Sequence, residues 1–492
     1  MKSWWGFAAL TVAAIAGGLP LGCSSSSGAP APSYLDRSTM LDPQTCQSCH
    51  ANHYDQWAAS MHATASDDPI FRAMNARGQR ETKGQLGSFC VKCHAPIALS
   101  EGATTNGLNL DSVPRPLRGV TCFFCHSIDS VTGSHNAAVS LSTDLAMRGE
   151  ISDPTPNRAH ASSYDTLQDR NHAESASLCG ACHDIVTTGG AHIERTFAEW
   201  QGSIFSHPEG DTCDQCHMSQ SATKGPIAQV SGTSLPARYV YSHDFPGVDV
   251  ALPAGSTTEQ KAVEQLLQTT LQTALCVTQQ GAVRVIVDNV AAGHFWPSGA
   301  VQDRRAWAEV IASKAGKMIY QSGVVPQGGS VTALSADPDL WLLRDCMFDA
   351  SGKPVDMFWQ AASVESNELP APVTLDPMNP SFYKTHVYQR FPRGISATLP
   401  QMPDQVTLRV RIQPIGVDVL ESLVKSGDLD AGVPGEMPIF DVTPIVTWTP
   451  AAAAAAALTY QEQGQPVACV SPSNLNVAAD KTLAVNHVKC SP

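Results

Sequence analysis

Basic residues are scarce in this sequence. Its 492 residues include 31 Lys and Arg against 45 Asp and Glu, which gives a net charge of -14. Binding to the phosphate backbone of nucleic acids needs clustered Lys and Arg, so the lack of such clusters excludes a nucleic-acid surface. The composition, 43% hydrophobic and 15% charged, is that of a soluble globular chain, and the length allows two or three domains.

Common catalytic signatures are missing as well. The sequence has no G-x-S-x-G, no H-E-x-x-H and no phosphate-binding glycine loop. These absences argue against a separate hydrolase or nucleotide site. Any chemistry of this chain therefore depends on other residues or on a bound group.

The N-terminus has the features of an export signal. Lys2 precedes an apolar stretch over residues 4–16, which is too short and too glycine-rich for a membrane span. LPLGC at residues 19–23 resembles the end of a bacterial lipoprotein signal, with Pro20 where that pattern usually has leucine. We predict a signal peptide over residues 1–22, lipidation of Cys23 and a flexible tether over residues 23–45. The protein is then periplasmic or at the cell surface, anchored to the outer membrane; export without a lipid is the alternative.

Ten of the 15 cysteines occur in five C-x-x-C-H motifs. This motif attaches haem c: two thiols one helical turn apart add to the vinyl groups of one haem, and the adjacent imidazole binds the iron. Zinc sites or disulfides would not place a histidine after every second cysteine. We therefore predict five covalently bound haem c groups. The attaching cysteines are Cys46, Cys49, Cys90, Cys93, Cys122, Cys125, Cys179, Cys182, Cys213 and Cys216, and the proximal iron ligands are His50, His94, His126, His183 and His217.

All five motifs lie within residues 46–247. At this density haem forms most of the core, so we predict short helices and loops with little sheet. Such a domain folds only with its cofactors. The irregular spacing of the motifs excludes a simple tandem repeat.

Histidine is abundant enough to supply a second ligand for each iron. The chain has 16 histidines, and those outside the motifs exceed the five that are needed. Their clustering near the motifs favours two histidines per iron and low potentials over ligation by Met61 or Met218. His53 follows His50 too closely to reach the opposite face of the same haem.

The order of the motifs and their aromatic neighbours resembles a known family. CQSCHANHYDQWAASMH, FCVKCHAP, GVTCFFCHSI, SLCGACHDI with ERTFAEWQGSIF, and CDQCHM are similar to successive elements of multihaem cytochromes c. These are related to the tetrahaem cytochrome of ammonia oxidation and, more distantly, to octahaem hydroxylamine oxidoreductase. The resemblance covers about residues 46–247 and implies a pentahaem member of a mainly electron-transferring family. The distal ligands that it implies are His62, His160 and His243, with His135, His192 and His172 as further candidates.

One further candidate ligand, His294, lies far from the motifs. It occurs in NVAAGHFWPSG, which resembles an element of β-domains that follow multihaem segments, where the histidine reaches a haem. Gly293 permits close approach of the backbone to a flat ring, and the Phe-Trp-Pro corner covers the ring edge. We predict His294 as a distal ligand, with Arg304 or Arg305 paired to a haem propionate. The alternative is an ordinary turn histidine.

The second half, residues 251–492, has no haem motif. STTEQKAVEQLLQTTLQ predicts a leading amphipathic helix. Alternating segments such as AVRVIVDNV, RAWAEVIASK, MIYQSGVV, LWLLRDCMF and QVTLRVRIQ predict an antiparallel β-sandwich of roughly seven to nine strands. The expected fold class is therefore α + β with two domains: a haem-packed, mainly α/coil domain followed by a sandwich. We assign no function to the alanines at residues 451–457.

Four cysteines of this half lie outside the motifs, and an exported protein would oxidise them. They are Cys276, Cys346, Cys469 and Cys490. Of the three possible pairings, we favour Cys276 with Cys346 and Cys469 with Cys490.

Three functions are compatible with these residues. The favoured one is an electron carrier, not an enzyme, in which closely packed haems pass electrons between redox partner proteins. An alternative is an enzyme that binds nitrite, hydroxylamine, peroxide or a similar molecule at a five-coordinate haem. The sequence lacks the C-x-x-C-K motif of the catalytic haem in pentahaem nitrite reductases, which argues against it. The third is a partner-binding module that carries haems. No nucleic acid is expected as a partner, and a membrane is contacted only through the lipid on Cys23.

Overall fold

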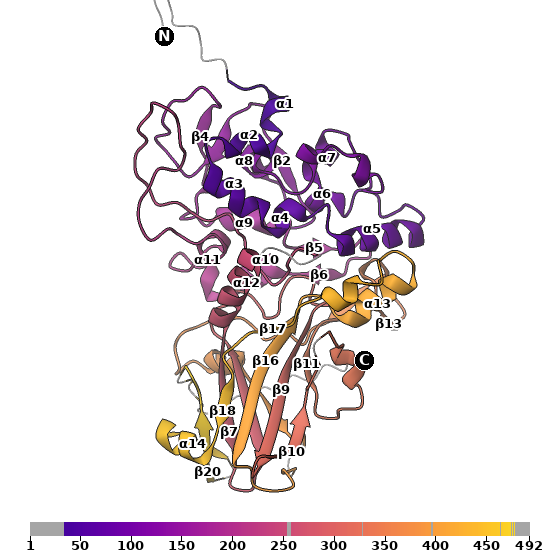
Figure 1. The fold of residues 1–492 in the computed structure, drawn as a ribbon, viewed down its shortest axis with the longest axis vertical. Helices are drawn as coiled ribbons and strands as arrows, with labels where there is room; N and C mark the ends of the chain where they lie inside the picture. Colours follow the sequence, from indigo (N-terminus) through magenta and orange to yellow (C-terminus); the bar gives the residue numbers. More distant parts are fainter. Residues whose placement is uncertain are drawn as a thin grey trace, which may run out of the picture.

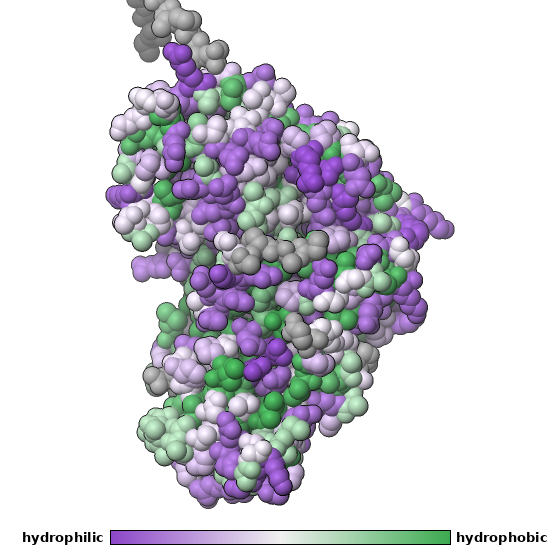
Figure 2. Space-filling model, viewed as in Figure 1, coloured by the Kyte–Doolittle hydropathy of each residue, from purple (hydrophilic) through white to green (hydrophobic). Residues whose placement is uncertain are grey.

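The computed structural model describes residues 34–477, except 253–256, 327, 395–396, 463, 474 and 476. The haem motifs and the large sheets occupy opposite ends of an elongated molecule (Figure 1). The face drawn in Figure 2 is mainly hydrophilic over the motifs, whereas hydrophobic residues are more frequent over the sheets. The predicted signal peptide and Cys23 lie outside the described residues. Within the described part of the chain, no helix is long and apolar enough to cross a membrane.

Short helices and loops make up the half that carries the motifs, as predicted. The helices are α1 (Arg37–Met40), α2 (Pro43–Gln47), α3 (Ala51–Ala58), α4 (Met61–Thr64), α5 (Pro69–Glu81), α6 (Val91–His94), α7 (Pro96–Ser100), α8 (Cys122–Ser127), α9 (Ser175–Gly180), α10 (Thr196–Gln201) and α11 (Cys213–His217). Three two-stranded ribbons join them: β1 (Ile128–Val131) with β2 (Val139–Leu141), β3 (Met147–Gly149) with β4 (Ser162–Tyr164), and β5 (Ile185–Val186) with β6 (His192–Glu194).

The end of the predicted tether is structured. Asp36 caps α1 by accepting a hydrogen bond from the Thr39 N–H at 2.8 Å. Met40 and Leu41 are buried in a cluster that includes Phe123. The chain is therefore ordered from α1 onward, before the predicted end of the tether at residue 45.

Two antiparallel sheets dominate the other half, and α12 (Thr257–Thr270) leads directly into the first of them, as predicted. The five-stranded sheet has the order β15-β8-β7-β20-β19. The six-stranded sheet has the order β10-β9-β16-β17, and β11 also pairs with β9 and β18 with β16. The strands are β7 (Leu271–Val277), β8 (Val283–Asn289), β9 (Arg305–Lys314), β10 (Lys317–Ser322), β11 (Trp341–Leu343), β15 (His386–Phe391), β16 (Gln405–Gln413), β17 (Phe440–Asp441), β18 (Val446–Trp448), β19 (Leu458–Glu462) and β20 (Gln465–Val470).

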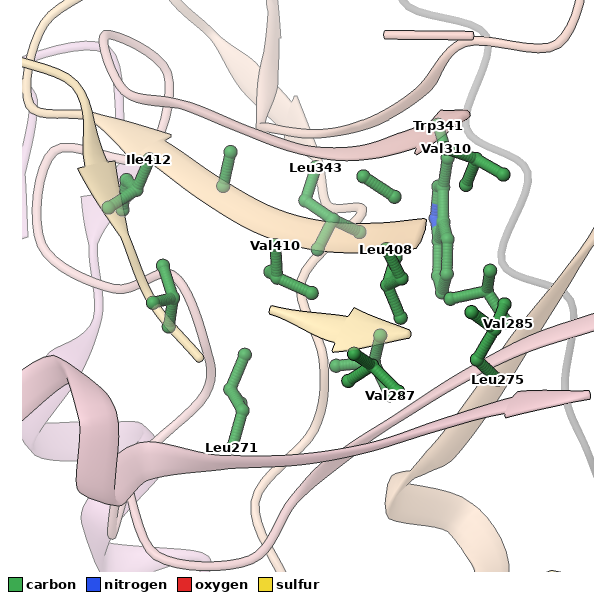
Figure 3. Close-up of a cluster of buried hydrophobic side chains, with 14 of the residues drawn as sticks. Leu271, Leu275, Val285, Val287, Val310, Trp341, Leu343, Leu408, Val410 and Ile412 are labelled. Carbon is green, nitrogen blue, oxygen red and sulfur yellow. The ribbon is translucent and has the colours of Figure 1, made fainter. Parts of the chain in front are cut away.

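The two sheets share one apolar core (Figure 3). Leu275 and Val285 from the five-stranded sheet are buried in the same cluster as Val310 and Leu408 from the six-stranded sheet. This packing is that of a sandwich, with six and five strands instead of the roughly seven to nine that we predicted.

Two smaller features of this half differ from the sequence pattern or add to it. LWLLRDCMF forms two strands in different sheets, β11 and β12 (Cys346–Phe348), and the latter pairs with β13 (Pro354–Val355) and β14 (Ser363–Glu365). The alanine run forms α14 (Pro450–Ala456), which Thr449 caps through a hydrogen bond from the Ala452 N–H. Alanine is the strongest helix former, which explains this helix.

The disulfide pairing is not the one that we predicted. Cys276 in β7 is bonded to Cys469 in β20, and the two residues lie directly opposite each other in the sheet. This bond excludes both favoured pairs, Cys276 with Cys346 and Cys469 with Cys490. Cys346 is also disulfide-bonded, and Cys490 lies outside the described residues.

The two halves contact each other through α5 and α13 (Val417–Lys425). Ile70 on α5 belongs to the same buried cluster as Leu420 and Leu423 on α13. Arg80 donates hydrogen bonds to both carboxylate oxygens of Asp428, at 2.5 and 2.6 Å. The contact is therefore apolar in its middle and ionic at its edge.

Candidate haem sites

The C-x-x-C-H motifs form helical turns. In three of them the histidine N–H donates to the carbonyl of the first cysteine, at 2.8 Å for His50, 3.2 Å for His94 and 3.0 Å for His183. Residues three apart in such a turn lie on the same side, so both thiols of a motif face one way. All ten motif cysteines are free thiols. The motifs thus fit the attachment of one haem each through two thioethers.

A bare metal ion fits these residues less well than haem does. Zinc needs about four ligands gathered around one point. No group of three or more His, Cys, Asp or Glu in the described part of the chain is placed to hold a metal ion. This finding argues against the zinc alternative for the motif cysteines.

The five motif histidines each have Nδ1 engaged in a hydrogen bond. A metal-binding histidine commonly donates its other ring N–H in this way, which fixes the ring and leaves Nε2 for the metal. The acceptors are Ile227 O for His50 (3.0 Å), Ala65 O for His94 (3.1 Å), Arg148 O for His126 (2.6 Å), Pro246 O for His217 (2.7 Å) and the carboxylate Oε1 of Glu194 for His183 (3.3 Å).

Three motif histidines face a histidine from outside the motifs. The ring centres of His50 and His160 are 6.4 Å apart, with an angle of 29° between the planes. Those of His126 and His243 are also 6.4 Å apart, at 21°. His62 and His183 are 6.3 Å apart, at 59°. The structure therefore brings together the three distal candidates that the family resemblance implied, each with a different motif.

The spacing of these pairs matches two imidazoles on one iron. A metal–nitrogen bond of about 2 Å on each side, plus about 1 Å from each nitrogen to its ring centre, separates the ring centres by about 6 Å. Directly stacked rings would lie closer, as His94 and Phe71 do at 4.1 Å. The separation of the three pairs is therefore compatible with a haem iron between the rings. It is not specific to such a site, because the ring centres of His50 and His53 are 5.9 Å apart.

Burial keeps the candidate distal ligands neutral. It lowers the pKa of His62 and of His243 to about 3 each. It also lowers the pKa of His294 to about 4, against a smaller opposing effect of the hydrogen bond to the Phe295 carbonyl. Only a neutral imidazole has a free lone pair for iron, so all three side chains are in the ligating form at pH 7.

His183 differs electrostatically from the other motif histidines. Burial lowers its pKa, but the hydrogen bond and charge of Glu194 outweigh burial and raise the pKa to about 9. Binding of His183 to iron would therefore displace the proton from its Nε2. Glu194 ends β6, and its side chain is only 15% exposed. A carboxylate in this position had not been anticipated from the sequence.

His94, like His217, has no ring contact with another histidine among the described residues at the separation of the three pairs. The His94 ring stacks on Phe71, with 11° between the planes. His94 therefore stands apart from His50, His126 and His183.

The loop that carries His294 is fastened to the motif half. Glu199 on α10 accepts hydrogen bonds from the Phe295 N–H at 3.2 Å and from the Ser298 hydroxyl at 2.7 Å. Asn289 donates to the His294 carbonyl at 2.8 Å, and the His294 Nδ1–H donates to the Phe295 carbonyl at 2.7 Å. Of the motif histidines, His217 has the larger electrostatic effect on His294 and His183 a smaller one. His294 therefore lies near motif histidines, although it belongs to the half that contains the large sheets.

Two further expectations for this loop have different outcomes. Gly293 has a left-handed φ of 79°, which favours glycine. A Cβ atom at this position would lie 3.8 Å from the Phe205 ring, so the backbone approaches an aromatic ring of the motif half closely. Arg304 bonds Asp249 at 2.9 and 3.0 Å, and Arg305 bonds Asp418. Both arginines have carboxylate partners within the chain, which argues against the predicted pairing with a propionate.

The weaker distal candidates lie on the surface. The side chains of His135, His172 and His192 are exposed. Exposure does not decide their role, because the motif histidine His183 is exposed as well; the three residues stay predictions. His53 is partly buried beside His243, with ring centres 4.7 Å apart.

Cysteines of different motifs lie next to each other. The thiols of Cys46 and Cys122 interact, which joins the first motif to the third. Cys93 interacts with Cys182, and Cys179 with Cys213. Cys125 also interacts electrostatically with Cys182. The five motifs therefore form one continuous group.

Comparison with known proteins supports the assignment of the five motifs to haem attachment. Residues 45–127 match the family described as cytochrome c554 and c-prime. A solved structure, the penta-heme cytochrome c552 from Thermochromatium tepidum, shares the fold with a TM-score of 0.56 and 18% sequence identity. The match covers 84% of this chain and 99% of that chain. No curated protein matches the chain. Together the motifs and these matches support a multihaem cytochrome c with covalently bound haem; the link to hydroxylamine oxidoreductase stays a prediction.

Proposed function

We propose that this chain is an exported pentahaem c-type cytochrome that passes electrons between redox partner proteins. The observation that carries the proposal is the set of three histidine pairs, each with ring centres 6.3 or 6.4 Å apart. Each pair combines a motif histidine with one from elsewhere in the chain. Bound haem supplies the one-electron chemistry of its iron.

The chain's own residues hold the rings and control access to them. Each pair would hold a haem iron between two imidazoles, which would leave a small substrate no free position on that iron. The backbone carbonyls of Ile227 and Arg148 orient His50 and His126. Cysteines of different motifs lie close together, so haems attached to them would be closely spaced, as electron transfer along a series of centres requires.

Export is supported by the sequence of the first 23 residues and by the chemistry of the cysteines. Cys276 and Cys469 form a disulfide, which is typical of proteins outside the reducing cytoplasm. We propose a periplasmic or cell-surface location with a lipid anchor at Cys23. Peptide mass mapping of protein from membranes tests the anchor, because unmodified Cys23 or a start at another residue would contradict it.

Electron paramagnetic resonance of the oxidised protein tests the proposed ligation. We expect low-spin signals from the haems of His50, His126 and His183. Substitution of His160, His243 or His62 by alanine should each convert a different single haem to high spin. Retention of every low-spin signal in all three variants would contradict the proposed ligation.

A second candidate function depends on His94. The absence of a facing histidine ring in the described part of the chain favours an open iron position there, at which a small nitrogen compound or peroxide binds. Addition of nitrite, hydroxylamine or peroxide separates the two functions. Ligand-dependent shifts of a one-haem high-spin signal, with turnover, favour the enzyme; an unchanged spectrum favours the carrier.

A further inference from the structure

A short hairpin brings Glu194 beside His183. β5 begins two residues after His183, and Ile185 in β5 pairs directly with Glu194 in β6. The Thr187 N–H donates to the Ala191 carbonyl at 2.8 Å and closes the hairpin. The chain then turns into α10, where the Phe197 N–H donates to the His183 carbonyl at 3.2 Å. His183 is thus held by the segment that directly follows its own motif.

The acceptor at His183 differs in charge from the other four. His50, His94, His126 and His217 donate Nδ1–H to neutral backbone carbonyls. His183 donates to the Glu194 carboxylate at 3.3 Å. A hydrogen bond to an ionised acceptor is roughly twice as strong as one between neutral groups. It also makes the imidazole more basic and a stronger electron donor to its metal.

We propose that Glu194 is a positioning residue that lowers the reduction potential of the haem between His183 and His62 relative to the other bis-histidine haems. The inference rests on the proposed function, because it requires a haem between these two rings. An electron-rich imidazole and a nearby negative charge both stabilise ferric over ferrous iron. Both effects act in the same direction.

The position of this haem gives the tuning a role in the relay. Cys182 of the same motif interacts with Cys93 of the second motif and, electrostatically, with Cys125 of the third. Cys179 interacts with Cys213 of the fifth. The fourth haem therefore adjoins three others. With a lowered reduction potential, the fourth haem is the last of the low-spin haems to be reduced. It therefore transfers electrons between its neighbours without retaining them.

Glu194 also acts on the second motif, more weakly. It interacts electrostatically with His94 and Cys93 but makes no hydrogen bond to either among the described residues. Removing its charge should therefore shift the haem of His94 in the same direction by a smaller amount. The difference between the shifts of the two haems distinguishes the effect of the hydrogen bond from the effect of the charge alone.

The test compares two variants of the holoprotein by potentiometric titration and electron paramagnetic resonance. Glu194→Gln keeps an oxygen acceptor but removes the charge, and Glu194→Asp keeps the charge but withdraws the carboxylate by one methylene. We expect both to raise the potential of the same haem, Glu194→Gln more strongly, and both to shift its g-values. His62→Ala identifies that haem by turning its signal high-spin.

Each outcome decides between clear alternatives. Unchanged potentials in both variants would overturn the inference. A raised potential in Glu194→Gln with unchanged g-values, and no effect of Glu194→Asp, would mean that charge acts through space and would also overturn the hydrogen-bond role. If His62→Ala leaves every haem low-spin, the proposed ligation itself fails, whatever the Glu194 variants do. If Glu194→Gln does not fold, Glu194→Asp alone decides through the g-values.

Discussion

Contacts with a motif histidine distinguish candidate ligands from other histidines near the motifs. His62 lies opposite His183 and His243 opposite His126, and burial holds His62 and His243 neutral. His135 and His192 are exposed on the surface. All four non-motif histidines occur near the motifs in the sequence, so sequence distance alone does not distinguish the two groups.

We expect His294→Ala to convert one low-spin haem to high spin, that of His217, because His217 has a larger electrostatic effect on His294 than the other motif histidine near it, His183. Electron paramagnetic resonance of the oxidised protein measures the change. His207→Ala is the matched control, because His207 is exposed and lies on the neighbouring turn after α10. Five unchanged haems in the His294 variant would mean that His294 is an ordinary turn residue.

Sequence patterns predict ligands only where a local spacing or a family resemblance encodes them. The C-x-x-C-H spacing predicts the five proximal histidines, and the family resemblance implies His62, His160 and His243, which the structure places opposite three of them. Glu194 and Glu199 escaped notice, because their partners are set by a hairpin and by a loop from the other half. A histidine-carboxylate contact of this kind has no fixed spacing in sequence.

At the level of strands and helices, periodicity located elements but not their neighbours. β8, β9 and β16 follow the alternating segments closely, since each has a face on the shared core. The disulfide was mispredicted because pairing depends on which strands lie side by side. β20 returns from the end of the described chain to pair with β7, a contact that no local pattern reveals.

Removal of the disulfide should weaken the five-stranded sheet. Cys276→Ala combined with Cys469→Ala releases a link across 193 residues, so we expect a loss of about 2–5 kcal/mol and a lower Tm. Circular dichroism of the sheets follows the transition, with haem absorbance as the control, which should stay unchanged at room temperature. Non-reduced peptide mapping that joins Cys276 to Cys346 would contradict the bond itself.

Across the whole molecule, the motif half has little apolar core of its own. Its buried clusters are small compared with the one between the two sheets, and its helices are mostly single turns. We therefore expect haem to contribute much of what holds this half together. The sheets, by contrast, have a core built from protein alone.

Expression without a cytochrome c maturation system should therefore yield a degraded chain, since the motif half cannot fold without haem. Immunoblotting with antibodies against each half measures survival. Residues 257–477 expressed in the same cells provide a comparison, because their core contains no haem motif. Isolation of a compact, haem-free full-length protein would contradict this expectation.

The histidine pairs also set an order of events during biogenesis. In the pair His62–His183, the histidine from outside the motifs comes first in the chain. In the pairs His50–His160 and His126–His243, the motif histidine comes first. If the chain is exported N-terminus first, the proposed pairs become complete in the order of their later members, His160, His183 and His243. The fourth haem would then meet a second ligand that is already present, whereas the first and third haems would each stay open on one side until a later part of the chain arrives.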